Sequence, residues 1–120
     1  KRGIRVLPGG DYGFPYNPIG RNARDLQWFV ELLGYSPTEA LVAATKLGGE
    51  LMGRGELLGQ VKPGYLADLL LVNGDPTRDV RVLQDQAKLA MIMKDGKLHK
   101  RSPRVRSTTS QPDSVALTNL

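Results

Sequence analysis

Apolar residues in the first half of the chain recur at helical spacing. Over residues 23–33 they fall three or four positions apart, which places them on one stripe of a helix. The stripe consists of Leu26, Phe29, Val30 and Leu33. Asn22 is the predicted N-cap, and Gly34 is the predicted stop, since glycine readily takes the left-handed conformation at a helix C-terminus.

The next segment predicts a second helix. Ser36 is the residue type expected of an N-cap, Pro37 suits the first helical position, and Glu39 completes a capping box. Small and apolar residues follow at Ala40, Leu41, Ala43, Ala44 and Leu47. Gly48-Gly49 is predicted to break this helix, with one further turn over 50–53.

Later in the chain the pattern changes to short apolar runs between turn residues, which is typical of β-strands. We expect strands at 3–8, 58–61, 66–72, 88–93 and 97–99, and a short helix or strand at 80–83. Asp95-Gly96 is a two-residue hairpin signal, because both residue types tolerate positive φ. From about Arg101 the sequence is rich in Ser, Thr and Pro and lacks periodicity, which favours a disordered tail.

The first predicted strand ends in glycines, and Asp11 follows them directly. Glycines let the backbone turn sharply, and an acid at the carboxyl end of a strand has the placement of a functional group. A turn cap is the other interpretation of Asp11. The loop that follows is aromatic, with Tyr12, Phe14 and Tyr16, and it also contains Asn17. A substrate-pocket wall and simple loop packing are both open for it.

Three polar residues precede or begin the first helix. Arg21, Asn22 and Arg24 could bind a substrate carboxylate, since arginine pairs well with carboxylates, or serve as a cap and surface charges. His99 stands alone among basic residues, so we expect an exposed strand residue rather than a metal ligand. Trp28 is expected in core or interface packing.

Composition excludes several classes of protein. The 120 residues suffice for one small domain or a piece of a larger one. The chain has no cysteine, which excludes a disulfide scaffold, cysteine zinc ligands and a cysteine nucleophile. No apolar run has the length of a membrane helix, and no signal peptide is expected.

The charge distribution argues against nucleic-acid binding. Residues 1–96 carry 12 basic and 11 acidic side chains, whereas residues 97–120 carry 5 and 1, so the net charge of +5 belongs mainly to the tail. The tail cations have no interleaved aromatic residues, as a nucleic-acid surface would require. We therefore interpret the tail as a solvated terminus.

Five segments carry a resemblance to a known family: Gly3–Asp11, Gly34–Thr45, Leu58–Val72, Gly74–Pro76 and Ile92–Lys97. In this order they resemble the C-terminal portion of the amidohydrolase superfamily, nearest the imidazolonepropionase-like and prolidase-like metal-dependent hydrolases. The resemblance covers residues 3–98. One opening strand cannot form a sheet by itself, so we expect the chain to be the last part of a longer protein.

The resemblance implies an α/β fold in two parts. Residues 1–56 would form the end of a (β/α)8 TIM-like barrel, with 3–8 as its last strand and 23–52 as its closing helices. Residues 57–100 would supply strands of a small composite β-sandwich, and residues 101–120 a disordered tail. In this layout Asp68 is a turn-stabilising carboxylate of the sandwich.

The resemblance also implies a role for Asp11. It falls where the family has an active-site aspartate that touches a divalent metal, Zn2+ above all, and exchanges a proton with the metal-bound water. The remaining ligands of the family, a His-x-His, a lysine and two further histidines, are absent from this chain, so we expect no activity from it alone. Gly10 stands where family members often have Ser or Thr.

The implied reaction is hydrolysis of an amide or other C–N bond in a small molecule, such as a dipeptide-like substrate, with Tyr12, Asn17 and Arg21 as candidate substrate contacts. The implied partner is the rest of the barrel; a homo-oligomer and a cytoplasmic location are further expectations. The alternative is a truncated, non-catalytic association module. In that case the apolar stripe of residues 26–33 would face a partner.

Overall fold

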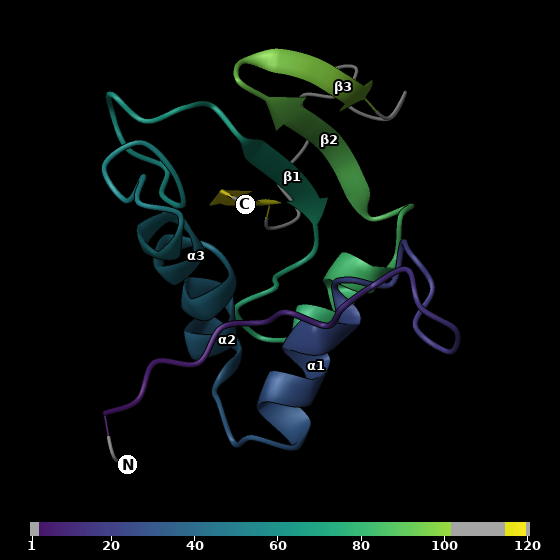
Figure 1. Ribbon diagram of the computed structural model, residues 1–120. Helices are drawn as coiled ribbons and strands as arrows, with labels where there is room; N and C mark the ends of the chain where they lie inside the picture. The colour runs from purple at the N-terminus through teal and green to yellow at the C-terminus, as the bar shows by residue number, and fades with distance from the viewer. Residues whose placement is uncertain (1–2, 102–114, 120) are drawn as a thin grey trace.

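The computed structural model describes residues 3–101 and 115–119, and for 115–119 only the backbone. Three helices pack beside a four-stranded antiparallel sheet (Figure 1). The elements are α1 (Arg24–Glu31), α2 (Pro37–Ala44), α3 (Lys46–Leu51), β1 (Leu69–Asn73), the 3-10 helix η1 (Val80–Gln84), β2 (Leu89–Lys94), β3 (Lys97–Arg101) and β4 (Val115–Asn119). Within the described part of the chain, no helix is both long and apolar enough to cross a bilayer.

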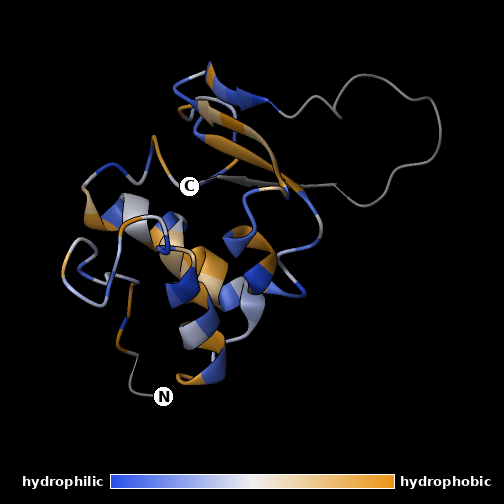
Figure 2. Cartoon of the chain, turned by 90° about the vertical axis from the view of Figure 1, so that its right-hand side faces the viewer, coloured by the Kyte–Doolittle hydropathy of each residue, from blue (hydrophilic) through white to orange (hydrophobic). Residues whose placement is uncertain are grey.

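The sheet has the order β3-β2-β1-β4, so β3 and β4 are its edges. In β1 the buried residues alternate, with Leu70 and Val72 inside, because successive side chains of a strand point to opposite faces. Leu70 pairs with Ile92 of β2. The outer strand β3 is mostly hydrophilic, as Figure 2 shows, and carries Lys97, Lys100 and Arg101.

The core lies between the inner face of the sheet, the helices and η1. Its buried residues are Leu26, Phe29, Ala40, Leu41, Ala43, Leu70, Val72, Val80 and Leu83. The predicted apolar stripe of α1 is therefore mostly core, with Val30 packed against it and Leu33 left 55% exposed. The interpretation of this stripe as a partner-facing surface is wrong, because α2 and η1 already cover it.

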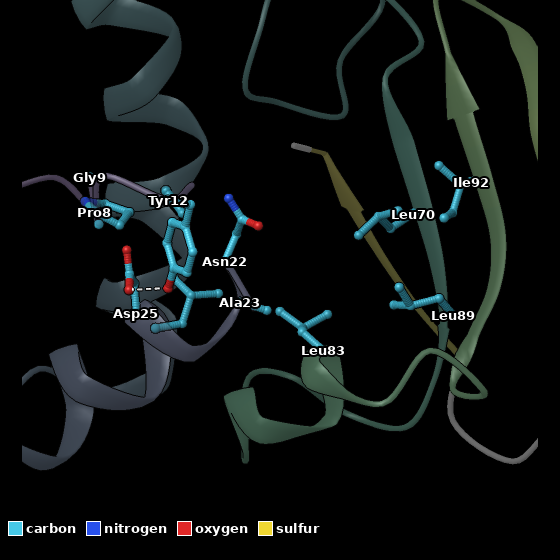
Figure 3. A pocket seen from close by; sticks show the side chains of 13 residues that line it. Pro8, Gly9, Tyr12, Asn22, Ala23, Asp25, Leu70, Leu83, Leu89 and Ile92 are labelled. Carbon is cyan, nitrogen blue, oxygen red and sulfur yellow. Dashed lines mark hydrogen bonds between the residues drawn. The ribbon is translucent and has the colours of Figure 1, made fainter. Parts of the chain in front are cut away.

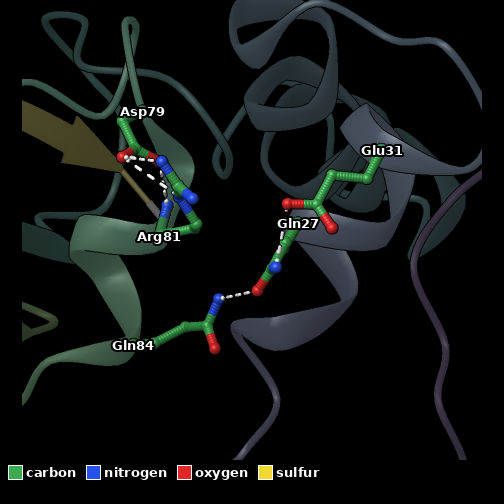
Figure 4. Close-up of polar contacts among 5 residues, drawn as sticks. All are labelled: Gln27, Glu31, Asp79, Arg81 and Gln84. Carbon is green, nitrogen blue, oxygen red and sulfur yellow. Dashed lines mark hydrogen bonds and ion pairs between the residues drawn. The ribbon is translucent and has the colours of Figure 1, made fainter.

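Polar side chains join η1 to α1 at the rim of this core (Figure 4). The amide of Gln84 donates to Gln27 at 2.8 Å, and Gln27 in turn donates to Glu31 one helical turn further at 2.9 Å. Asp79 caps η1 by accepting from the backbone N–H of Arg81 at 3.0 Å and pairs with its guanidinium. The prediction left helix and strand open at 80–83, and the structure has the helix.

Helix termini agree with the sequence prediction at α2 and differ at α1. The Ser36 hydroxyl accepts from the N–H of Glu39 at 3.2 Å, and the Glu39 carboxylate accepts from the N–H of Ser36 at 2.8 Å, so the capping box is confirmed. The N-cap of α1 is Ala23 instead of Asn22, whose side chain accepts from Gly20 at 3.2 Å. Gly34 has the expected positive φ, 70°.

The predicted break at Gly48-Gly49 is wrong, since α3 runs through both glycines. The helix breaks at Thr45 instead, with φ −109° and ψ −81°. A Cβ on Gly49 would lie 2.8 Å from the carbonyl oxygen of Leu58, and one on Gly59 would lie 2.3 Å from that of Thr45. These glycines permit close backbone packing between the 58–59 segment and the helices.

Two predicted strands do not form. Residues 3–8 have no strand partner in the described part of the chain, and residues 58–61 form a loop that packs on the α2–α3 junction. The predicted disordered tail is also wrong at two places, because Arg101 ends β3 and 115–119 form β4, antiparallel to β1. The remainder of that predicted tail, 102–114 and 120, lies outside the described residues.

The strands at 66–72, 88–93 and 97–99 are confirmed as β1, β2 and β3, and Asp95 and Gly96 form the hairpin turn with φ 48° and 73°. The buried carboxylate of Asp68 accepts from the N–H of Asp95 at 2.7 Å and from the Lys94 ammonium. Asp68 thus anchors the hairpin to the start of β1, which confirms its turn-stabilising role. The hydrogen bond from Lys94 is the main cause that holds the pKa of Asp68 below its usual 3.8.

Asp68→Asn is expected to lower the free energy of unfolding by about 1–3 kcal/mol, because a charge-assisted buried hydrogen bond is lost. Since folding lowers the pKa of Asp68 below 3.8, its contribution is complete above pH 3.8 and is lost as the pH falls below that value. Urea denaturation of wild type and Asp68→Asn at pH 7 and pH 2.5 measures this contribution. Glu56→Gln, which changes an exposed carboxylate, is the control. A gap between wild type and Asp68→Asn that is equal at both pH values would contradict the assignment.

Candidate functional site

Asp11 is exposed and lies in the left-handed region, with φ 46°. Aspartate enters this region more readily than most residues with a Cβ, as Asp95 does at φ 48°, so the contacts around Asp11 decide whether it stays there. Both neighbours of Asp11 are held by such contacts.

On one side, Asn17 fastens the loop to the residue before Asp11. Its side-chain amide donates to the carbonyl oxygen of Gly10. The loop itself closes as a small hairpin, with Gly13 N–H on Asn17 O at 2.9 Å and Asn17 N–H on Phe14 O at 3.1 Å. Tyr16, at φ 73°, and Phe14 point outward, 101% and 68% exposed.

On the other side, Tyr12 is bound to α1. Its hydroxyl donates to the carboxylate of Asp25 at 2.6 Å and lies 3.1 Å from the carbonyl oxygen of Arg21 (Figure 3). Asp25 is only 7% exposed. Burial, and after it the hydrogen bond and the charge of Asp25, raise the pKa of Tyr12 above 10.0. Tyr12 therefore keeps its proton and acts as a hydrogen-bond donor.

Gly10 lies directly against this pair. A Cβ at Gly10 would be 2.5 Å from Cε2 of Tyr12 and 2.7 Å from Oδ2 of Asp25, closer than real Cβ contacts. The same test at Gly9 finds nothing within 4 Å. Close contacts therefore require glycine at position 10 and leave space for a side chain at position 9.

The three polar residues before and within α1 do not form one anion site. Arg21 is exposed and contributes its carbonyl oxygen to Tyr12. Asn22 accepts from Gly20. Arg24 stacks over Trp28, 4.5 Å from the ring centroid, and Trp28 is 39% exposed, so this aromatic residue is outside the core.

A pocket of about 500 Å3 separates the Asp11 loop from the sheet. Figure 3 shows Tyr12 and Asp25 on one wall and the apolar side chains of the sheet and η1 on the other. The apolar lining consists of Leu26, Ala44, Leu70, Leu83, Leu89 and Ile92. Asp11 is not among the lining residues, so this pocket is separate from its carboxylate.

Asp25 and Gly10 are site residues that the sequence analysis missed. Acids are common and usually solvated in the first turn of a helix, so the position of Asp25 there does not by itself indicate a site. A signal was present, because Asp25 lies four positions before Phe29 and so shares the buried face of α1. A carboxylate on a buried face requires a donor, and Tyr12 supplies it.

The described residues do not form a metal centre by themselves. Within 3–101, no group of three or more His, Cys, Asp or Glu side chains is close enough to hold a metal ion. His99 is exposed on β3, as predicted. A catalytic zinc requires about three protein ligands, so Asp11 alone does not suffice.

Comparison with known proteins identifies the class. The model of the amidohydrolase family matches residues 18–99. The ochratoxinase of Aspergillus niger is 35% identical over 101 residues, which is 83% of this chain and 20% of that protein. The chain therefore belongs to the amidohydrolase family, a family of hydrolases, and spans about a fifth of the length of the curated relatives it matches.

Solved structures agree. A protein assigned as a prolidase from Bifidobacterium longum matches with a TM-score of 0.76 and 32% identity, over 82% of this chain and 24% of that one. A Xaa-Pro dipeptidase with methionine bound in its active site matches with a TM-score of 0.62 and 32% identity, over 68% of this chain and 19% of that one. The expected membership of the superfamily is thus confirmed.

Asp25→Asn is expected to lower the pKa of Tyr12 toward 10.0, because the nearby negative charge is removed while burial remains. An NMR titration of the Tyr12 ring carbon measures this. Glu31→Gln removes an exposed carboxylate from the same helix and should leave the titration unchanged. An unchanged Tyr12 pKa in Asp25→Asn would contradict the hydrogen bond.

Gly10→Ala is expected to lower the free energy of unfolding by about 1–3 kcal/mol, since the new methyl group overlaps the Tyr12 ring. Gly9→Ala is the matched control and should change it by less than about 0.5 kcal/mol. Denaturant unfolding of both variants measures the difference. Equal effects at the two positions would show that the close contact at Gly10 is absent.

Proposed function

We propose that this chain is the C-terminal part of a metal-dependent hydrolase that cleaves an amide or other C–N bond. Family membership and its hydrolase relatives support the class. The observation that carries the role of Asp11 is its exposed carboxylate on a left-handed residue held from both sides. An exposed acid on a loop, with both neighbouring residues held by contacts, is suited to chemistry more than to packing.

The proposed cofactor is a divalent metal, with zinc as the first candidate. The described residues supply one oxygen ligand, Asp11, and the other ligands come from polypeptide outside this chain. When bound, such a metal lowers the pKa of a water molecule to about 7 and polarises a carbonyl group. Asp11 would contact the metal and hold a proton on its carboxylate during the reaction.

We further propose that residues 1–56 complete a (β/α)8 barrel and that 57–100 belong to a composite β-sandwich. The unpaired 3–8 segment supports this, since it would become a strand once neighbouring strands are present. The carboxyl ends of barrel strands carry the active site in such enzymes, and Asp11 follows that segment directly. The chain by itself is expected to be inactive, because its described residues supply too few ligands for a catalytic metal.

The proposed substrate is a small amide or dipeptide-like molecule, in keeping with the ochratoxinase and the Xaa-Pro dipeptidase among the similar proteins. The exposed guanidinium of Arg21 could pair with a substrate carboxylate. The Tyr12 hydroxyl donates to Asp25, so Tyr12 would act on substrate through the shape of the rim. The amide nitrogen of Asn17 donates to Gly10, whereas its buried Oδ1 has no hydrogen-bond partner among the described residues and could accept from a substrate donor.

Asp11→Asn in the complete polypeptide that contains this chain is expected to lower kcat by about 10²–10⁴-fold, the range for loss of a group that transfers protons. Hydrolysis of Xaa-Pro dipeptides and of ochratoxin measures it, with and without added zinc. Asp79→Asn, which removes an exposed carboxylate on η1, is the control and should keep the wild-type rate. Wild-type activity in Asp11→Asn would remove Asp11 from the proposal.

A further inference from the structure

We propose that Tyr12 and Asp25 are positioning residues, a hydrogen-bonded pair under Gly10 that holds Asp11 in its left-handed conformation and so aims its carboxylate. Neither side chain needs to touch substrate for this role. The inference rests on the proposed function of Asp11 and adds the means by which the fold directs that residue.

The first step is the conformation of Asp11. At φ 46° its backbone lies in the left-handed region, which aspartate enters more readily than most residues with a Cβ but does not prefer. Left to itself, the loop would relax to an ordinary conformation and turn the carboxylate elsewhere. A contact within one residue of Asp11 is the most direct means of preventing that, and Tyr12 makes such a contact with α1.

The second step is the strength of that contact. Asp25 is buried on a helix of the core, between Arg24 and the buried Leu26, so the acceptor is rigid. A buried carboxylate loses its hydration and has a strong requirement for a donor. The Tyr12 hydroxyl meets this requirement by donating to the carboxylate at 2.6 Å.

The third step is the close fit at Gly10. The ring of Tyr12 and the carboxylate of Asp25 occupy the space where a side chain at position 10 would stand. Asn17 binds the carbonyl oxygen of this same residue. Asp11 therefore lies between two fixed residues. The backbone of Gly10 is held by close packing, and the side chain of Tyr12 is held by the buried carboxylate of Asp25.

The pair differs from a purely structural contact in what its loss would change. A contact that only stabilises the fold would lower the melting temperature and leave the turnover of the folded enzyme unchanged. A positioning pair lowers kcat while the enzyme remains folded, because the carboxylate is misaligned. Substrate affinity depends on other groups, so KM should change little.

The experiment uses the complete polypeptide with Tyr12→Phe, Asp25→Ala, Asp25→Asn and the double variant Tyr12→Phe/Asp25→Ala. Tyr12→Phe keeps the ring and removes only the hydroxyl. We expect it to lower kcat by about 10–100-fold with KM within about twofold, as for a small misplacement of a reacting group. Asp25→Asn should retain more activity than Asp25→Ala, because the amide oxygen can still accept the hydroxyl hydrogen bond.

The double variant should be no slower than the slower single variant, because each change breaks the same hydrogen bond. Glu31→Gln is the control on the same helix and should behave as wild type. Crystal structures of wild type and Tyr12→Phe give a reading independent of turnover. We expect Asp11 to leave the left-handed region in the variant.

The outcomes separate this inference from the proposed function. If Asp11→Asn is inactive while Tyr12→Phe has wild-type kcat, the pair is not a positioning device and the proposed function stands. If Asp11 keeps its positive φ in Tyr12→Phe, the inference is overturned whatever the activity. If Asp11→Asn is fully active, the proposed role of Asp11 fails, and with it the catalytic part of this inference.

Discussion

The carboxylate of Asp25 is buried at the start of α1, and burial without a strong donor would be costly. The donor comes from a loop, not from a neighbouring helix, so one hydrogen bond joins the irregular N-terminal segment to the packed core. Asp68 repeats this arrangement on the sheet, where a buried carboxylate fastens the β2–β3 turn to the entry of β1. In both places a charge inside the protein orders a segment that has little apolar surface of its own.

Each of these two carboxylates lies in or directly before an element that contributes to the apolar core, Asp25 in α1 and Asp68 before β1. The buried alanines of α2, Ala40 and Ala43, belong to this core, and the core residues come from elements spread over residues 26–83. The Asp11 loop, by contrast, contributes exposed aromatic side chains and buries almost nothing. Its geometry depends on hydrogen bonds and on the close contact at Gly10 rather than on hydrophobic packing.

Local signals predicted local structure well. The capping box at Ser36 and Glu39 and the Asp95-Gly96 turn depend on residues within a few positions of one another, and both are present. The prediction of a helix break at Gly48-Gly49 is wrong because the requirement for glycine at position 49 is non-local: the backbone carbonyl of Leu58 approaches Gly49. The 3–8 strand failed for a related reason, since strand formation requires a partner that the described residues do not contain.

The candidate site was predictable in part. Asp11 stood out by its position after a glycine turn, whereas Asp25 resembled an ordinary helix-start acid, and its partner lies thirteen residues earlier in the chain. Spacing alone does not reveal such a contact. It follows only once α1 is placed with residues 25, 26 and 29 facing inward.

The cations of β3 affect how this chain meets other copies of itself. An edge strand presents unpaired backbone groups, which invite a second sheet to add to the first. Lys97, Lys100 and Arg101 bring like charges into any pairing of two such edges. The hairpin can therefore expose its outer strand to solvent while intermolecular β-sheet growth from that edge is opposed by electrostatic repulsion, and salt would weaken this protection.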